Sequence, residues 1–185
     1  TAYATPLGEI PVASALVNEI DENLGASSDL YLQRIANDRE HSLEIQLPFL
    51  QVALKEQFKL LPVMVRTHDP EKLQAAASVI AKSFGSKRVL VVASTDLSHF
   101  YPERIANTYD KAMTTHFIDF DPEGVLRAEA NQEGFACGAG AVALALWTTR
   151  LLGAKKVTLL HHTTSAEASG DTSSVVGYAA AAITG

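Results

Sequence analysis

The sequence Ser94-Thr95-Asp96-Leu97-Ser98-His99 places a carboxylate and an imidazole three residues apart, directly after a run of aliphatic residues. A neighbouring carboxylate can fix the tautomer of an imidazole and prepare the ring to act as a general acid or base. Because ligand sites in open α/β sheets lie at the carboxyl ends of strands, we predict catalytic roles for Asp96 and His99. The structural alternative is that Asp96 caps a helix and His99 is an ordinary loop residue.

A second acid and histidine pair, His41 and Glu44, lies in a segment that we predict to be helical over residues 39–50, capped by Asp38. Residues three apart share a face of a helix. Pro48 would bend this helix at a cost of about 3 kcal/mol, and a broken local rule beside such a pair favours a site. We therefore interpret His41 and Glu44 as substrate-binding, with a surface ion pair as the alternative.

Cys137, the only cysteine, comes just before Gly138 and an apolar run that predicts a helix. The amino terminus of a helix stabilises a thiolate through its dipole and free N–H groups. A thiolate can ligate a soft or borderline metal, and it can also attack a carbonyl with His99 as the activating base. From the residues alone, the roles of metal ligand, nucleophile and small buried core residue all remain open for Cys137.

The elements that must position these residues alternate between strands and helices. Continuous apolar runs predict strands over 59–65 and 89–93, and the Asp69-Pro70 pair opens a helix that ends at Phe84. A strand, helix and strand in this order predict a right-handed parallel crossover. The fold that we expect is α/β, a three-layer αβα sandwich around a mostly parallel or mixed central sheet.

The remaining elements follow from the same patterns. Apolar spacing and proline positions predict helices over 12–24 (ending at Gly25), 103–120 and from 122 onward, with another after Gly138, and strands over 156–162 and 175–183. The residues between these two strands, 163–174, read as a polar loop. His116 falls on a helix surface, and the adjacent His161 and His162 point to opposite faces of a strand, so we leave all three out of the site.

Composition limits the classes of function. The chain has 185 residues, 47% of them hydrophobic and 19% charged, which fits one domain over 1–185 with its own core. A net charge of -6 disfavours a nucleic-acid partner. No apolar run reaches the roughly 20 residues that a membrane helix needs, and a single cysteine forms no internal disulfide, so we expect a cytoplasmic protein without a membrane partner.

Several motifs together resemble the Memo family, which includes protein B of the AmmeMemoRadiSam system, in their order and spacing. The specific ones are Glu40-His41-Ser42-Leu43-Glu44-Ile45-Gln46-Leu47-Pro48-Phe49 and Ser94-Thr95-Asp96-Leu97-Ser98-His99; the others are Thr5-Pro6-Leu7, Cys137-Gly138 and Val176-Gly177-Tyr178-Ala179-Ala180. The resemblance spans nearly the whole chain. It implies a fold similar to that of class III extradiol (LigB-type) dioxygenases, which use a non-haem iron.

The resemblance also implies roles for individual residues. Cys137 matches a metal ligand of the family and His99 a catalytic-type histidine, with Asp96 nearby. The family has two further metal-binding histidines in upstream stretches that this chain lacks, so we expect the chain to lack the amino-terminal strands of the domain. We also expect the uncovered sheet to favour a homo-oligomer.

These expectations define a leading function and two alternatives. The intact protein would be a metal-dependent oxidoreductase or redox protein of unknown substrate that uses non-haem iron or copper. This chain alone would hold no metal tightly and would be inactive. Its partner would be a small molecule or a peptide. The alternatives are a non-catalytic module that binds such a ligand in the same pocket, and a hydrolase with a cysteine nucleophile.

Overall fold

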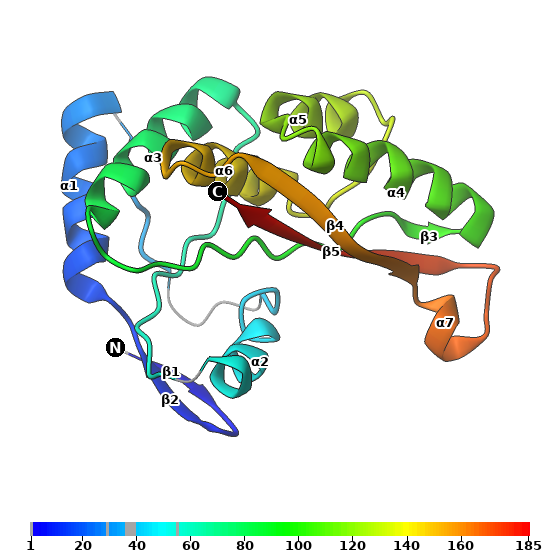
Figure 1. Cartoon of the computed structure of the whole chain (residues 1–185), viewed down its shortest axis with the longest axis horizontal. Coiled ribbons are helices and arrows are strands. Elements are labelled where there is room, and N and C mark those ends of the chain that lie inside the picture. Colours follow the sequence, from blue (N-terminus) through cyan, green and yellow to red (C-terminus); the bar gives the residue numbers. More distant parts are fainter. Residues whose placement is uncertain (1, 29, 36–39, 55) are drawn as a thin grey trace. The chain divides into compact units, whose positions relative to one another are not determined.

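The computed structural model describes residues 2–28, 30–35, 40–54 and 56–185, and Figure 1 draws the whole chain. Asp38, the predicted helix cap, lies outside the described residues. The chain divides into two compact units, residues 1–64 and residues 65–185. The single domain over 1–185 stays a prediction, because compactness alone does not show whether the two units fold separately.

The first unit contains a hairpin and two helices. Its elements are β1 (Ala2–Thr5), β2 (Gly8–Pro11), α1 (Ser14–Ser28) and α2 (Gln46–Ala53). The two strands pair antiparallel. The hydroxyl of Thr5 lies 2.6 Å from Oε1 of Gln51, which ties the hairpin to α2. Both strands of the hairpin are short and mostly exposed.

Two predictions for the first unit were wrong in detail. Helix α1 continues through Gly25 to Ser28, and α2 begins at Gln46, so His41 and Glu44 lie before the helix rather than on it. Pro48 is therefore the third residue of α2. The first four N–H groups of a helix have no partner within it, so a proline here removes no helical hydrogen bond and imposes no bend.

Four predicted helices of the second unit are confirmed. They are α3 (Pro70–Phe84), α4 (Glu103–Ile118), α5 (Pro122–Ala130) and α6 (Ala139–Leu151). Asp69 and Asp121 cap α3 and α5 through their carboxylates, each directly before a proline. A short helix, α7 (Ala166–Ser169), occupies part of the predicted polar loop.

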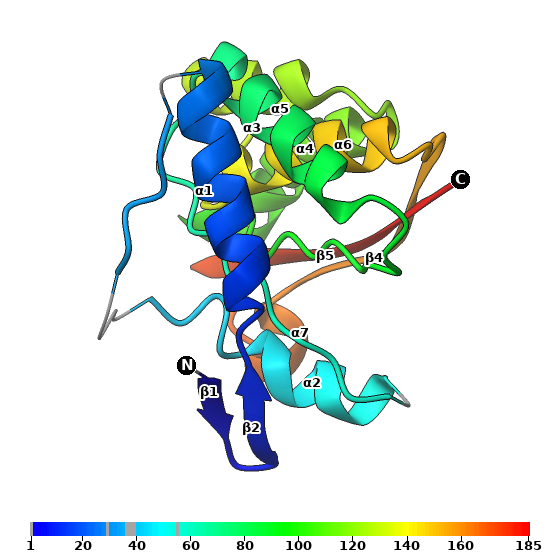
Figure 2. The ribbon, with the colours of Figure 1, turned by 90° about the vertical axis from the view of Figure 1, so that its left-hand side faces the viewer.

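The second unit has one three-stranded antiparallel sheet. Its strands are β3 (His99–Tyr101), β4 (Lys156–Thr164) and β5 (Val175–Thr184), in the order β3-β5-β4. Figures 1 and 2 show α3, α4, α5 and α6 on one side of this sheet. Helix α4 packs against β4 and β5, and α6 packs against α3 and α5.

The predicted parallel central sheet does not form among the described residues. The α/β composition is confirmed, but both sheets are antiparallel, and the predicted strands 59–65 and 89–93 are not strands. Within the described ranges, the one parallel contact is an isolated bridge between Val12 and Leu60. Leu90, expected to be buried, is 63% exposed. An apolar run favours an extended, covered segment, but a strand also needs a neighbouring strand to pair with.

The core of the second unit surrounds the segments that carry the candidate site. Its buried members are Leu97, Met113, Phe117, Phe120, Val125, Ala128, Ala136, Ala139, Val142, Leu146 and Val157. Leu97 lies between Asp96 and His99, and Ala136 and Ala139 flank Cys137, so the site residues are anchored by apolar neighbours in the chain. No helix in the described part of the chain is long and apolar enough to cross a membrane.

Candidate functional site

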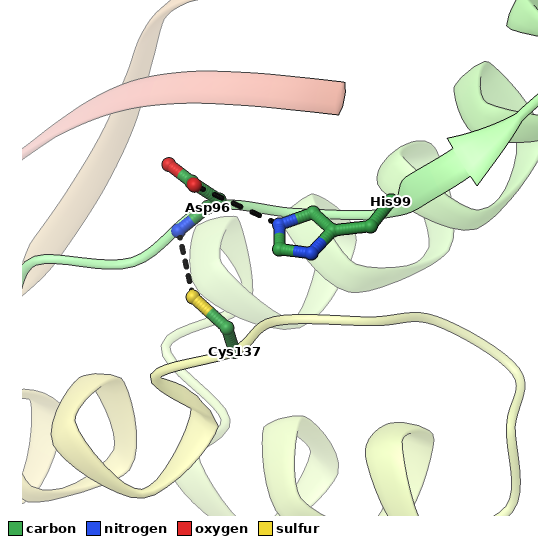
Figure 3. Close-up of side chains that lie close together, drawn as sticks. All are labelled: Asp96, His99 and Cys137. Carbon is green, nitrogen blue, oxygen red and sulfur yellow. Dashed lines mark hydrogen bonds and ion pairs between the residues drawn. The ribbon is translucent and has the colours of Figure 1, made fainter. Parts of the chain in front are cut away.

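Three of the predicted side chains, Asp96, His99 and Cys137, lie together in the second unit (Figure 3). One ligand atom from each can be chosen so that all three lie within 4.8 Å of one another. Asp96 comes from the segment that leads into β3, His99 is the first residue of β3, and Cys137 comes just before α6. Two distant parts of the sequence thus supply an oxygen, a nitrogen and a sulfur donor to one place.

Main-chain hydrogen bonds hold Cys137 against Asp96. The N–H of Asp96 donates to Sγ of Cys137 at 3.2 Å, and the N–H of Cys137 donates to the carbonyl of Asp96 at 3.2 Å. The hydroxyl of Thr95 accepts from the N–H of Gly138 at 2.8 Å and lies 3.6 Å from Sγ. These hydrogen bonds fix the position of the sulfur, the atom through which a cysteine ligates metals and attacks electrophiles.

Gly138 allows this close approach. A Cβ atom at this position would lie 2.7 Å from the carbonyl oxygen of Ser94 and 3.0 Å from Cβ of Thr95. The first contact involves main-chain atoms, which cannot rotate away. The close contact with Ser94 therefore requires a residue without a side chain at position 138.

The ring of His99 presents an unpartnered nitrogen to the cluster. Its Nε2 atom is buried, has no hydrogen-bond partner in the described part of the chain, and lies 3.6 Å from Oδ2 of Asp96. A buried polar atom without a partner is costly, so this nitrogen is suited to bind a ligand. Asp96 and the His99 side chain as a whole are partly exposed, so the cluster is open to solvent.

Pairing with β5 fixes the direction of His99. The N–H of Leu97 donates to the carbonyl of Gly177 at 2.9 Å, and the N–H of Gly177 donates to the carbonyl of Ser98 at 2.8 Å. The register shifts between His99 and Tyr101, where Phe100 has a φ of 65°. A bulge of this kind redirects side chains beside functional sites.

His41 and Glu44 belong to the first unit and contact each other, with Nδ1 of His41 2.7 Å from Oε1 of Glu44. Their side chains are 78% and 65% exposed. The Glu40 carboxylate accepts N–H groups from Ser42 and His41, and the Ser42 hydrogen bonds hold the pKa of Glu40 below its usual value. The substrate-binding roles of His41 and Glu44 stay predictions.

Sequence analysis missed Asp110 and His162, which contact each other beside the cluster. Nε2 of His162 lies 2.9 Å from Oδ2 of Asp110, a fully buried carboxylate on α4. A signal was present: Asp110 shares the buried stripe of α4 with Ala106, Met113 and Phe117, where an acidic residue is unexpected. Of the histidines left out, His161 is exposed, and His116 pairs with Asp121 at 3.4 Å outside the cluster.

Known proteins of one family are similar in sequence to nearly the whole of this chain. The sequence model of the family described as "Memo-like protein" matches residues 1–182. A "MEMO1 family protein" of Nitrosopumilus maritimus is 36% identical over 178 residues, which are 96% of this chain and 64% of the relative. Relatives with the same family designation from Methanosarcina barkeri and Sulfolobus acidocaldarius are 33% and 34% identical, and the matches cover 96% and 95% of this chain. The chain spans between 61% and 66% of the length of these three curated relatives.

Proposed function

This chain belongs to the Memo-like protein family, and we propose that Asp96, His99 and Cys137 form a transition-metal site that the intact protein uses in redox chemistry. The observation that carries the proposal is the convergence of three donor atoms within 4.8 Å from two distant segments. Family membership supports the proposal but assigns no reaction, because one fold hosts many activities.

The donor set favours particular metals. A thiolate and an imidazole suit iron, copper and zinc, whereas magnesium and calcium prefer sites made of oxygen atoms alone. Three protein ligands leave coordination positions for water or a substrate, as catalytic metal sites require. A bound iron or copper ion would supply one-electron chemistry and activation of a coordinated substrate.

The three residues of the cluster differ in the roles that they can take. Cys137 is the ligand on which the site depends, because a thiolate is the strongest donor of the three for these metals. Asp96 and His99 have two roles open to them: further ligation, and proton transfer beside a metal held by Cys137. If Nε2 of His99 binds the metal, it cannot move a proton, so the two roles give different results on mutation.

Cobalt(II) binding tests the site in this chain. We expect a weak complex with a thiolate-to-cobalt absorption band, because three donors fall short of a closed four-ligand site. Cys137→Ser should abolish the band, and His161→Ala, which changes an exposed histidine outside the cluster, should leave it intact. Absence of the band at saturating cobalt, or its persistence in Cys137→Ser, would contradict the proposal.

His99→Ala separates the two roles of the histidine. Weaker cobalt binding would assign His99 to the metal, whereas unchanged binding would assign it to proton transfer. His41 and Glu44 are proposed to bind the substrate, a small molecule or peptide, so His41→Ala and Glu44→Gln should leave the cobalt spectrum unchanged. Acylation of Cys137 by an activated ester in a metal-free burst would instead favour a hydrolase with a cysteine nucleophile.

A further inference from the structure

The carboxylate of Asp110 is fully buried inside the second unit and has two polar partners. Oδ1 accepts the main-chain N–H of Ser98 at 3.0 Å, and Oδ2 lies 2.9 Å from Nε2 of His162. A carboxylate oxygen accepts, so the ring N–H of His162 donates. A buried carboxylate is strongly destabilising unless it is paired in this way, so both partners are needed to keep it inside.

Gly177 on β5 makes room for the carboxylate. A side chain at this position would overlap all three atoms of the Asp110 carboxyl group. The carboxylate therefore lies at the point where α4, β4, β5 and the segment before β3 meet. An acidic side chain in this position joins four elements, a role that an apolar residue of similar size would not perform.

The main chain of Ser98 links Asp110 to the cluster. Its N–H donates to Asp110, and its carbonyl accepts from the N–H of Gly177 at 2.8 Å. The Ser98 hydroxyl is buried and has no partner among the described residues, so the hydrogen bonds of Ser98 all involve its main chain. Ser98 lies directly before His99 and two residues after Asp96, so fixing its peptide groups orients both site residues.

We propose that Asp110, held in place by His162, is a positioning residue that sets the geometry of Asp96 and His99 against Cys137. The carboxylate touches none of the three donor atoms and acts through the N–H of Ser98. This inference extends the proposed function. The expected effect on metal affinity rests on that function, whereas the effect on the hydrogen bond of the Ser98 N–H can be measured independently of it.

Amide hydrogen exchange measured by NMR on the full chain gives that independent test. Asp110→Ala should speed exchange of the Ser98 N–H by at least roughly tenfold. Without the Asp110 carboxylate as acceptor, the segment around Ser98 should open locally more often. Asp110→Asn should restore most of the protection, since an amide oxygen still accepts from Ser98. Ser98→Ala removes only the unpaired hydroxyl, so the residue 98 amide should stay protected.

A matched control separates positioning from general destabilisation. Asp121, at the start of α5, likewise accepts a main-chain N–H, that of Gly124, and pairs with a histidine ring, that of His116; it also pairs with Arg127. Asp121→Ala should therefore destabilise the chain and leave exchange at Ser98 unchanged. If Asp110→Ala does not fold, exchange of the Ser98 N–H is compared in His162→Gln and His162→Ala instead. The glutamine amide can still donate to Asp110, so only His162→Ala should speed this exchange.

Cobalt affinity provides the second readout. Groups that orient metal ligands typically contribute about 10-fold to 100-fold in affinity, so Asp110→Ala should weaken cobalt binding by about tenfold while Ser98→Ala leaves it unchanged. Unchanged Ser98 exchange in folded Asp110→Ala would overturn the inference. If the unmodified chain binds no cobalt, the proposed metal function fails, and the exchange measurements alone still decide whether Asp110 positions the segment.

Discussion

The main-chain N–H of Asp96 donates to Sγ of Cys137 at 3.2 Å, and the N–H of Cys137 donates back to the carbonyl of Asp96 at the same distance. Two residues 41 positions apart in the sequence are thus joined by a reciprocal pair of hydrogen bonds. The pair fixes the sulfur near the Asp96 carboxylate through main-chain groups of both residues. Changes to the main chain around Cys137 should therefore affect the site as strongly as changes to its side chains.

Gly138→Ala should destabilise the protein by about 1–3 kcal/mol, because the new Cβ would press on the main-chain carbonyl of Ser94. Thermal or denaturant unfolding measures the loss. Gly25→Ala is the matched control, since its Cβ meets only an ordinary 3.9 Å contact and alanine favours the interior of α1. Equal stability of Gly138→Ala and the parent chain would show that the segment holding Ser94 can move away.

Thr95→Val should cost about 1–2 kcal/mol, because the N–H of Gly138 loses the hydroxyl oxygen that accepts it at 2.8 Å. The shape of the side chain is nearly preserved, so the unpaired N–H dominates the change. Denaturant unfolding compares this variant with Thr149→Val, where the hydroxyl donates to the Ala145 carbonyl within α6 and its removal leaves no N–H unpaired. A loss of the same size in both variants would contradict the prediction.

Asp69 should stabilise α3 in a pH-dependent way. Its carboxylate accepts the N–H groups of Lys72 and Glu71, and chiefly the Lys72 hydrogen bond holds its pKa below the usual 3.8. A lowered pKa in the folded state means that the contribution is fully present above about pH 3.8 and is lost as the pH falls through the folded value. Asp69→Asn should therefore differ from the parent at neutral pH and converge with it as the pH falls below 3.8 and through the folded pKa of Asp69.

Unfolding midpoints of the parent and Asp69→Asn across this pH range measure the effect. The carboxylate is exposed, so added salt should reduce the difference at neutral pH. A difference that stays constant between pH 7 and pH 3 would show that the charge of Asp69 does not stabilise the helix.

Self-association is expected from the exposed apolar side chains of the second unit. Leu160 on β4 is 64% exposed and Phe100 on β3 is 76% exposed, and exposed apolar side chains of this size favour contacts with other chains. Sizing at rising protein concentration should reveal oligomers that Leu160→Asp weakens. His161→Asp, a new acidic residue at the adjacent exposed position, is the control, and a monodisperse monomer at high concentration would count against the prediction.

The sequence by itself determined α3, α4, α5 and α6 and their starting residues, whereas the short helix α7 was not predicted. Asp69-Pro70 and Asp121-Pro122 identify helix starts because the cap and the following proline act within one turn, without help from distant residues. The same local chemistry predicted Asp96, His99 and Cys137 as candidate site residues, and the structure brings these three side chains together. In contrast, Pro48 was misinterpreted, because its effect depends on where α2 begins, and that boundary carries no local cap.

Tertiary structure alone decided which of these groups meet and how the strands pair. The apolar run at 89–93 predicts a strand, yet strand formation requires a partner that no local pattern specifies. The contact of Asp96 with Cys137 and the burial of Asp110 beside Ser98 and His162 likewise depend on how α4, α6 and β4 pack within the second unit. Local sequence selects residues and elements through short-range forces, whereas the site exists only where long-range packing and strand pairing bring distant segments together.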